Sequence, residues 1–268
     1  MAGQARAGAH RDYALRLAGE MSPGHVPQVI DVNPDTCVIV IEAAHGSSVT
    51  WKDELFAGHV AAHVPERLGE LLGTWHSETA ARRSELLPLF NDYDAFEQLR
   101  IGPYHRTVAA RAPELAGAIE AVIVTMEATR TCLVHGDFSP KNVLVGPDLL
   151  WVIDFEVAHF GDPAFDVAFM LTHLLLKAVH QPADASAYRH AFDRLLAAYR
   201  SAVHPDLLPS GVYLTSHLGC LLAARAIGKS PAEYLTAPEA DRVLRLGASL
   251  LLRPADDPAD CWRRLAHV

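Results

Sequence analysis

Three short apolar runs lie close together in a chain that is otherwise patterned as helices. They are residues 132–134, 143–145 and 149–153, and polar loop residues separate them. Apolar runs of this length bounded by polar residues favour strands. The flanking helical pattern gives no regular alternation of strand and helix. The block therefore predicts an α+β fold, in which a small β segment is embedded in a mainly helical body.

The first part of the chain has a different pattern. Residues 9–20 have helical apolar spacing, and two strand-like pieces follow at 26–32 and 37–42, joined by turn residues at 33–35. This arrangement predicts a helix followed by a hairpin. Residues 46–48 (Gly-Ser-Ser) are typical of a linker, and helices are expected from there on, for example at 60–78 and 113–127. We expect a small lobe over residues 1–45 and a larger helical lobe over residues 46–268.

Composition limits the kinds of partner. Of the 268 residues, 50% are hydrophobic and 21% are charged, which is enough apolar material for a core. The net charge of −9 argues against nucleic acid or an anionic membrane as a partner. The four cysteines form no CxxC pair, so a disulfide framework or zinc site is not expected. With no apolar signal segment and no stretch of membrane-spanning length, we expect a cytoplasmic protein.

Polar side chains follow the strand-like runs. His135, Asp137 and Asn142 come after the first run, and Asp154 comes directly after the third. Because a hairpin returns its second strand beside its first, the oxygens of Asp137, Asn142 and Asp154 are expected to converge. Carboxylate and amide oxygens suit Mg²⁺, which holds phosphate oxygens. The block therefore predicts a magnesium and phosphate site.

This block resembles the aminoglycoside phosphotransferase and choline kinase-like family, whose members are relatives of the protein kinases. The family pattern is H-G-D-x-x-x-x-N, then I-D-[FW]-E, then G-D-P-x-x-D. The chain supplies these elements with matching spacing as His135-Gly136-Asp137 with Asn142, Ile153-Asp154-Phe155-Glu156, and Gly161-Asp162-Pro163 with Asp166. The resemblance implies a protein-kinase-like fold with a β-rich N-terminal lobe and a helical C-terminal lobe.

The resemblance also implies an activity, namely ATP- and Mg²⁺-dependent transfer of a phosphoryl group to a hydroxyl of a small molecule. Acceptor classes in such a family include aminoglycosides, amino alcohols and sugars, and the sequence does not choose among them. Asp137 would orient the acceptor hydroxyl and take its proton. Asn142 and Asp154 would hold Mg²⁺ between the nucleotide phosphates.

Supporting roles follow from the same resemblance. His135 would hold the backbone of its loop. Asp162 would support its own loop or contact the substrate. Asp166 would either cap the helix that it opens or brace the catalytic loop. The hinge that meets adenine would be formed by Glu42, Ala43 and Ala44.

Two interpretations remain open for Lys141 and two for the segment 100–104. Lys141, beside Asn142, either approaches a phosphate or is a solvated loop residue. The segment 100–104 either packs structurally or contacts the acceptor, because relatives build acceptor pockets from the corresponding insertion.

Two further patterns imitate binding motifs. Gly228-Lys229-Ser230 looks like the end of a phosphate-binding loop but follows a helical stretch, which favours a helix end. His59 and His63 have metal-ligand spacing but lack a third ligand, which favours one polar helix face.

The N-terminal lobe departs from the family pattern. About 41 residues precede Glu42, and they match only one helix and two strands of the family's lobe. There is no Gly-rich loop and no lysine before Lys52. Three explanations stay open: a misassigned start codon, a natural short form with weak or no activity, or a partner chain that supplies the missing part. The alternative function is a catalytically weak or inactive kinase-like binding or regulatory protein. An unpaired sheet edge would also favour self-association.

Overall fold

The computed structural model describes residues 2–36 and 38–268, with side chains described from residue 12 onward. Cys37, where the second strand was expected to begin, lies outside the described residues. The architecture is a mainly helical body with three small antiparallel sheets, as the sequence predicts. In the part of the chain described, no helix combines the length and apolar character that crossing a bilayer requires.

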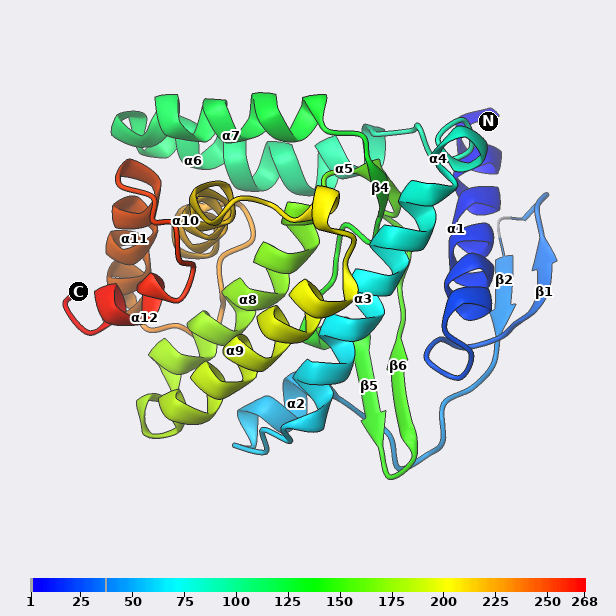
Figure 1. Ribbon diagram of the computed structural model, residues 1–268, viewed down its shortest axis with the longest axis horizontal. Coiled ribbons are helices and arrows are strands. Elements are labelled where there is room, and N and C mark those ends of the chain that lie inside the picture. Colours follow the sequence, from blue (N-terminus) through cyan, green and yellow to red (C-terminus); the bar gives the residue numbers. More distant parts are fainter. Residues whose placement is uncertain (1, 37) are drawn as a thin grey trace.

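The N-terminal segment is a helix followed by a hairpin, at the edge of the molecule (Figure 1). Helix α1 (Ala2–Met21) buries Leu17 and Ala18 against the body. Strands β1 (Val29–Asn33) and β2 (Val38–Ile41) pair antiparallel and form a sheet of two strands. The predicted helix and hairpin are thus confirmed, although β1 begins three residues later than expected. Several apolar side chains of this hairpin stay exposed: Ile30, Val38, Val40 and Ile41.

The three apolar runs of the central block are all strands. β5 (Val143–Gly146) and β6 (Leu149–Val152) form the predicted hairpin, and β3 (Val49–Thr50) pairs with the other edge of β5. β4 (Cys132–Val134) pairs with β7 (His159–Gly161) in a separate two-stranded sheet. The β3–β5–β6 sheet and the β4–β7 sheet are both short. The loop between β4 and β5 lies beside the end of β6, where Ile153 donates its N–H to the carbonyl of Asn142.

Long helices form the core of the helical body. Helix α3 (His63–Ala81) packs along α9 (Ala185–Ala202), with α8 (Pro163–His180) beside α9 (Figure 1). A Cβ on Gly73 of α3 would lie 2.8 Å from the Cβ of Ala202, so glycine permits this close approach. α3 begins later than the expected residue 60, because residues 57–59 still bond back to α2 (Trp51–Phe56).

A second group of helices completes the body at the other side of α8. α10 (Gly211–Ile227) packs closely along α11 (Ala237–Leu252). One further helix of ordinary length is α7 (Ala116–Ala128). The remaining elements are α4 (Arg83–Leu86), α5 (Asp94–Phe96), the π-helix η1 (Glu97–Arg106), α6 (Thr107–Arg111), η2 (Pro113–Leu115), η3 (Pro140–Asn142), η4 (Pro182–Asp184), η5 (Pro205–Leu207) and α12 (Asp260–Leu265).

Candidate active site

The loop between β4 and β5 makes a sharp turn at Gly136. This residue has a φ of +74°, in the left-handed region that glycine adopts without strain. A Cβ here would lie 2.8 Å from the carbonyl oxygen of Val157, so the loop also packs too closely for a side chain. The turn directs the next residue, Asp137, back toward the body.

Asp166 fixes this turn from the first helical turn of α8. Its carboxylate accepts the main-chain N–H groups of His135 at 2.6 Å and of Gly136 at 2.9 Å. Asp166 is fully buried, and His76 lies 3.5 Å from the same carboxylate. Burial by itself raises the pKa of Asp166, but the nearby His76 and His135 outweigh it, and the pKa lies below its ordinary value. Of the two roles considered for Asp166, the geometry is therefore that of a brace.

The cap of α8 is Asp162. Its side chain accepts the N–H of Ala164 at 2.9 Å, in the usual manner of an N-cap. The hydroxyl of Tyr213 donates to the other carboxylate oxygen at 2.5 Å. Asp162 thus joins the start of α8 to α10, beneath the loop that Asp166 braces.

His135 ties the loop to the end of β6. Its Nδ1 accepts the N–H of Asp137 at 3.2 Å, so the ring proton is on Nε2. Nε2 then donates to the carbonyl of Ile153 at 3.0 Å. The buried imidazole therefore links Asp137 to the residue that precedes Asp154.

Asn142 contacts Asp137 directly. Its Nδ2 donates to the main-chain oxygen of Asp137 at 3.0 Å and to Oδ2 at 2.9 Å. Both partners are acceptors, so the amide nitrogen must face them and the amide oxygen Oδ1 is directed elsewhere. The main-chain oxygen of Asn142 also accepts the N–H of Ile153 at 2.9 Å, which brings the backbone of Asp154 next to this loop.

Asp154 has an unusual backbone. Its φ of +69° is the one positive value at a non-glycine residue in the described chain. Aspartate tolerates this region better than most residues, and such strain is commonly found at functional sites. The main-chain bond between Ile153 and Asn142 brings the backbone next to Asp154 close to the loop. Carboxylate and amide oxygens, the donor types of Asp154 and Asn142, suit Mg²⁺. No cluster of three or more His, Cys, Asp or Glu side chains placed to bind a metal occurs among the described residues.

Two cations contact the carboxylate of Asp137. Nη2 of Arg100 lies 2.8 Å from Oδ1, and Nζ of Lys141 lies 2.8 Å from Oδ2. Arg100 comes from the π-helix η1, is almost buried, and also donates from Nε to the carbonyl of Gly136 at 2.8 Å. Lys141 is about half exposed. Sequence considerations placed Arg100 only in a segment with two open interpretations, and its contact with Asp137 was not foreseen.

Residues 42–44, which were expected to form the hinge, make none of the contacts described above. The N–H of Glu42 donates to the carbonyl of Gln28 at 2.8 Å, and its carboxylate accepts the N–H of Gln28 at 3.2 Å. Ala43 is exposed and Ala44 is partly exposed. The segment therefore continues the β1–β2 hairpin and leads into β3.

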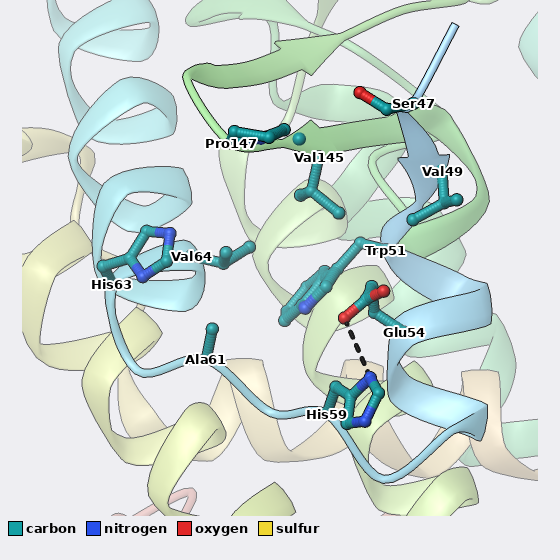
Figure 2. A pocket seen from close by; sticks show the side chains of 11 residues that line it. Ser47, Val49, Trp51, Glu54, His59, Ala61, His63, Val64, Val145 and Pro147 are labelled. Carbon is teal, nitrogen blue, oxygen red and sulfur yellow. Dashed lines mark ion pairs between the residues drawn. The ribbon is translucent and has the colours of Figure 1, made fainter.

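A cavity of about 420 Å³ lies where α2 and the start of α3 meet β3 and β5 (Figure 2). His59 and His63 both line it, but His59 lies in the turn before α3, so the expected single helix face is wrong. His59 instead pairs with Glu54 at 3.3 Å (Figure 2). No residue of the 135–142 loop lines this cavity, and it is separate from the candidate active site.

Known proteins resemble the chain in sequence and in fold. A methylthioribose kinase of Bacillus velezensis is 26% identical over 260 aligned positions, which cover 80% of this chain and 65% of that protein. The chain thus spans slightly less than two thirds of this curated relative. An amicoumacin kinase solved with AMP-PNP and Ca²⁺ superposes with a TM-score of 0.54 at 16% identity, over 96% of this chain and 80% of the other. An aminoglycoside phosphotransferase of Alicyclobacillus acidocaldarius has a TM-score of 0.48 at 19% identity, over 97% and 85%.

A model of the phosphotransferase enzyme family matches residues 6–209, which include the whole block from His135 to Asp166. The kinase-like fold of the solved amicoumacin kinase agrees with that match. The chain therefore belongs to the phosphotransferase enzyme family.

Proposed function

We propose that this protein transfers the terminal phosphoryl group of ATP to a hydroxyl group of a small molecule, with Mg²⁺ as its metal. The observation that carries the proposal is the direct contact of Asn142 with Asp137, in a loop braced by Asp166. In this arrangement the buried carboxylate of Asp137 binds the amide nitrogen of Asn142, and the amide oxygen of Asn142 is free to bind a cation. The family match and the relatives that act on small molecules support the same class of reaction.

In the proposed reaction, Asp137 accepts a hydrogen bond from the acceptor hydroxyl and takes its proton. The acceptor oxygen forms a bond to the terminal phosphorus as the bond from that phosphorus to the bridging oxygen of ADP breaks. Phosphoryl transfer has a loose transition state, so positioning of the hydroxyl is the main task of the protein. Arg100 would hold the Asp137 carboxylate in place during this step.

Asn142 and Asp154 are the residues that would hold Mg²⁺, which would neutralise charge on the nucleotide phosphate oxygens. Oδ1 of Asn142 fits this role because Nδ2 is already engaged by Asp137. Glu42, Ala43 and Ala44 would provide the backbone that faces adenine.

The proposal is tested with Asp137→Asn, measured as ADP release over a panel of hydroxyl compounds. Loss of a general base typically lowers kcat by about 10²–10⁴-fold, while nucleotide binding is retained. The matched control is Asp148→Asn, which alters an exposed aspartate at the tip of the β5–β6 hairpin. Turnover that survives Asp137→Asn would refute the role of Asp137.

A second candidate is a kinase-like protein that binds ligands without catalysis. It is favoured by the two cations that already hold the Asp137 carboxylate, Arg100 at Oδ1 and Lys141 at Oδ2, because a carboxylate paired in this way is a weaker base. Thermal shift with ATP and Mg²⁺ separates the two functions, since a ligand of the folded state raises the melting temperature. An unchanged melting temperature at millimolar ATP would favour the second candidate.

We also propose that the chain divides near residue 45 into a small N-terminal lobe and a helical lobe. The exposed apolar residues of the β1–β2 hairpin would then be the site of self-association. Ile30→Lys and Val40→Lys would lower concentration-dependent association measured by sedimentation. Unchanged association would remove the hairpin from that role.

A further inference from the structure

All four lysines of the chain line one cavity of about 330 Å³, which we call the lysine cavity. The chain has 23 Lys and Arg residues, and the other 19 are arginines. Arg225 also lines the cavity, and the one carboxylate among its lining residues is the exposed Glu233. The basic side chains of its lining are Lys52, Lys141, His173, Lys177, Arg225 and Lys229. This is a concentrated positive charge in a chain with a net charge of −9.

Lys177 is the buried member of this group. It is 1% exposed, and its Nζ lies 5.0 Å from the ring centre of Phe56 and 5.9 Å from that of Tyr234. No hydrogen bond or ion pair holds this ammonium within the described residues. Burial, followed by the charges of Lys52 and Arg225, lowers its pKa to about 7. An ammonium in this position is costly for the fold unless an anion joins it.

The cations lie close enough to repel one another. Nζ of Lys52 lies 5.9 Å from the ring centre of Phe56, the same ring that Lys177 contacts. Burial lowers the pKa of His173 well below its ordinary value, and the charges of the cavity lysines and Arg225 lower it further. A ligand with negative charge relieves this repulsion, whereas a polycation increases it.

The lysine cavity opens at the catalytic loop. Lys141 lines it and lies 2.8 Å from the Asp137 carboxylate, and Pro140 of the same loop lines it as well. The remaining lining residues come from α2, α8, the end of α10 and the segment 229–234. None of the proposed adenine or metal residues is among them. The cavity is therefore placed for the acceptor rather than for the nucleotide.

We propose that the lysine cavity binds a phosphate or carboxylate group of the acceptor, so that the acceptor is an anionic hydroxyl compound. The inference rests on the proposed function and names its substrate class. It excludes polycationic acceptors such as aminoglycosides. Lys177 would bind the anionic group at the base of the cavity, and Lys52 and Lys229 would bind it from the rim.

The first experiment measures equilibrium binding without turnover. Inorganic phosphate, a sugar monophosphate, a sugar acid and the parent neutral sugar are titrated into Asp137→Asn protein by calorimetry, with and without Mg²⁺ and AMP-PNP. We expect the sugar monophosphate or sugar acid to bind at least about tenfold more tightly than the neutral sugar. Equal binding of all four compounds would overturn the proposal. Because Asp137→Asn is used, this result is independent of whether the chain catalyses transfer.

The second experiment locates the binding. The exposed pair Lys52→Gln and Lys229→Gln is combined in one variant, and its control is Arg189→Gln with Arg245→Gln, which removes the same charge from exposed sites on α9 and α11. We expect the lysine variant, and not the control, to weaken anion binding about tenfold or more, with AMP-PNP affinity unchanged. A loss of AMP-PNP affinity instead would assign the cavity to the nucleotide phosphates and overturn the proposal. Equal losses in both variants would show only an unspecific charge effect and would also overturn it.

Lys177→Met tests the base of the cavity. A methionine fills similar space without charge, so the variant is expected to fold and to lose anion binding about tenfold or more. Retained anion affinity in folded Lys177→Met would refute the role of Lys177. In the active protein, failure of the proposed function appears differently, as absence of transfer to every acceptor despite intact anion binding.

Discussion

Arg100 reaches from the π-helix η1 to the Asp137 carboxylate and places Nη2 2.8 Å from Oδ1. The two side chains are almost buried, and Nε of the same guanidinium holds the carbonyl of Gly136. One side chain thus fixes both the turn and the carboxylate of the loop. Arginine suits this task because its planar fork donates in two directions at once.

Arg100→Met is expected to destabilise the protein by about 3–5 kcal/mol, because it leaves the Asp137 carboxylate buried with one fewer partner. Chemical denaturation measures the loss. Arg100→Lys restores the charge without the fork, so it should recover part of the stability but not the kcat. If Arg100 only filled space, Arg100→Met would keep its kcat and its pH profile.

Asp166→Asn is expected to cost about 2–4 kcal/mol, because an amide cannot accept both main-chain N–H groups with the strength of a carboxylate. The folded pKa of Asp166 lies below its ordinary value. Its contribution to stability is therefore present above the unfolded pKa and is lost as pH falls through the folded pKa. Denaturation curves from pH 6 downward should show the difference between wild type and variant shrinking below about pH 4. A difference that stays constant with pH would contradict this account.

Lys177→Met is expected to raise the free energy of unfolding near pH 7 by about 1–4 kcal/mol, because it removes a buried cation without a partner. The folded pKa of about 7 lies below the ordinary 10.5, so the unfolded chain binds more protons between these values. Wild-type stability should therefore gain with pH from about 7 to 10 relative to the variant. Lys52→Met, at an exposed position, should leave this slope unchanged. Parallel pH profiles of wild type and Lys177→Met would disprove the assignment.

Gly136→Ala is expected to lower stability by more than about 1 kcal/mol and to reduce kcat. The positive φ strains a side chain, and the new Cβ would press on the Val157 carbonyl. Gly117→Ala is the control, because a Cβ there meets nothing within 4 Å and alanine suits the helix α7. The control should be stabilised, and its kcat should equal that of wild type. A Gly136→Ala protein as stable as wild type would show that the turn is not under this constraint.

The strands of the central block were predictable because they depend on the pattern of neighbouring residues along the chain. The strands at 132–134, 143–146 and 149–152 follow from short apolar runs, and the loop residues stand at fixed distances along the chain. The hydrogen bond from Asn142 to Asp137 spans only five positions within one loop. The start of α3 was misplaced because backbone bonds at the end of α2 extend the preceding turn.

Other contacts depend on tertiary packing and leave no signal in the sequence. Arg100 meets Gly136 across 36 positions, His76 meets Asp166 across 90, and Tyr213 meets Asp162 across 51. Each partner is positioned by a helix whose neighbours are set by the whole core. The lysine cavity is the extreme case, because each of its four lysines comes from a different segment and no local pattern connects them.

The confinement of lysine has a practical consequence for labelling. Apart from the α-amino group, every primary amine of this chain lines the lysine cavity. An acylating dye or aldehyde resin would therefore attach the protein in nearly one orientation. Burial lowers the pKa of Lys177 to about 7, but the same burial shields this amine from the reagent. Protection of the exposed Lys52 and Lys229 from such a reagent would therefore report occupancy of the cavity.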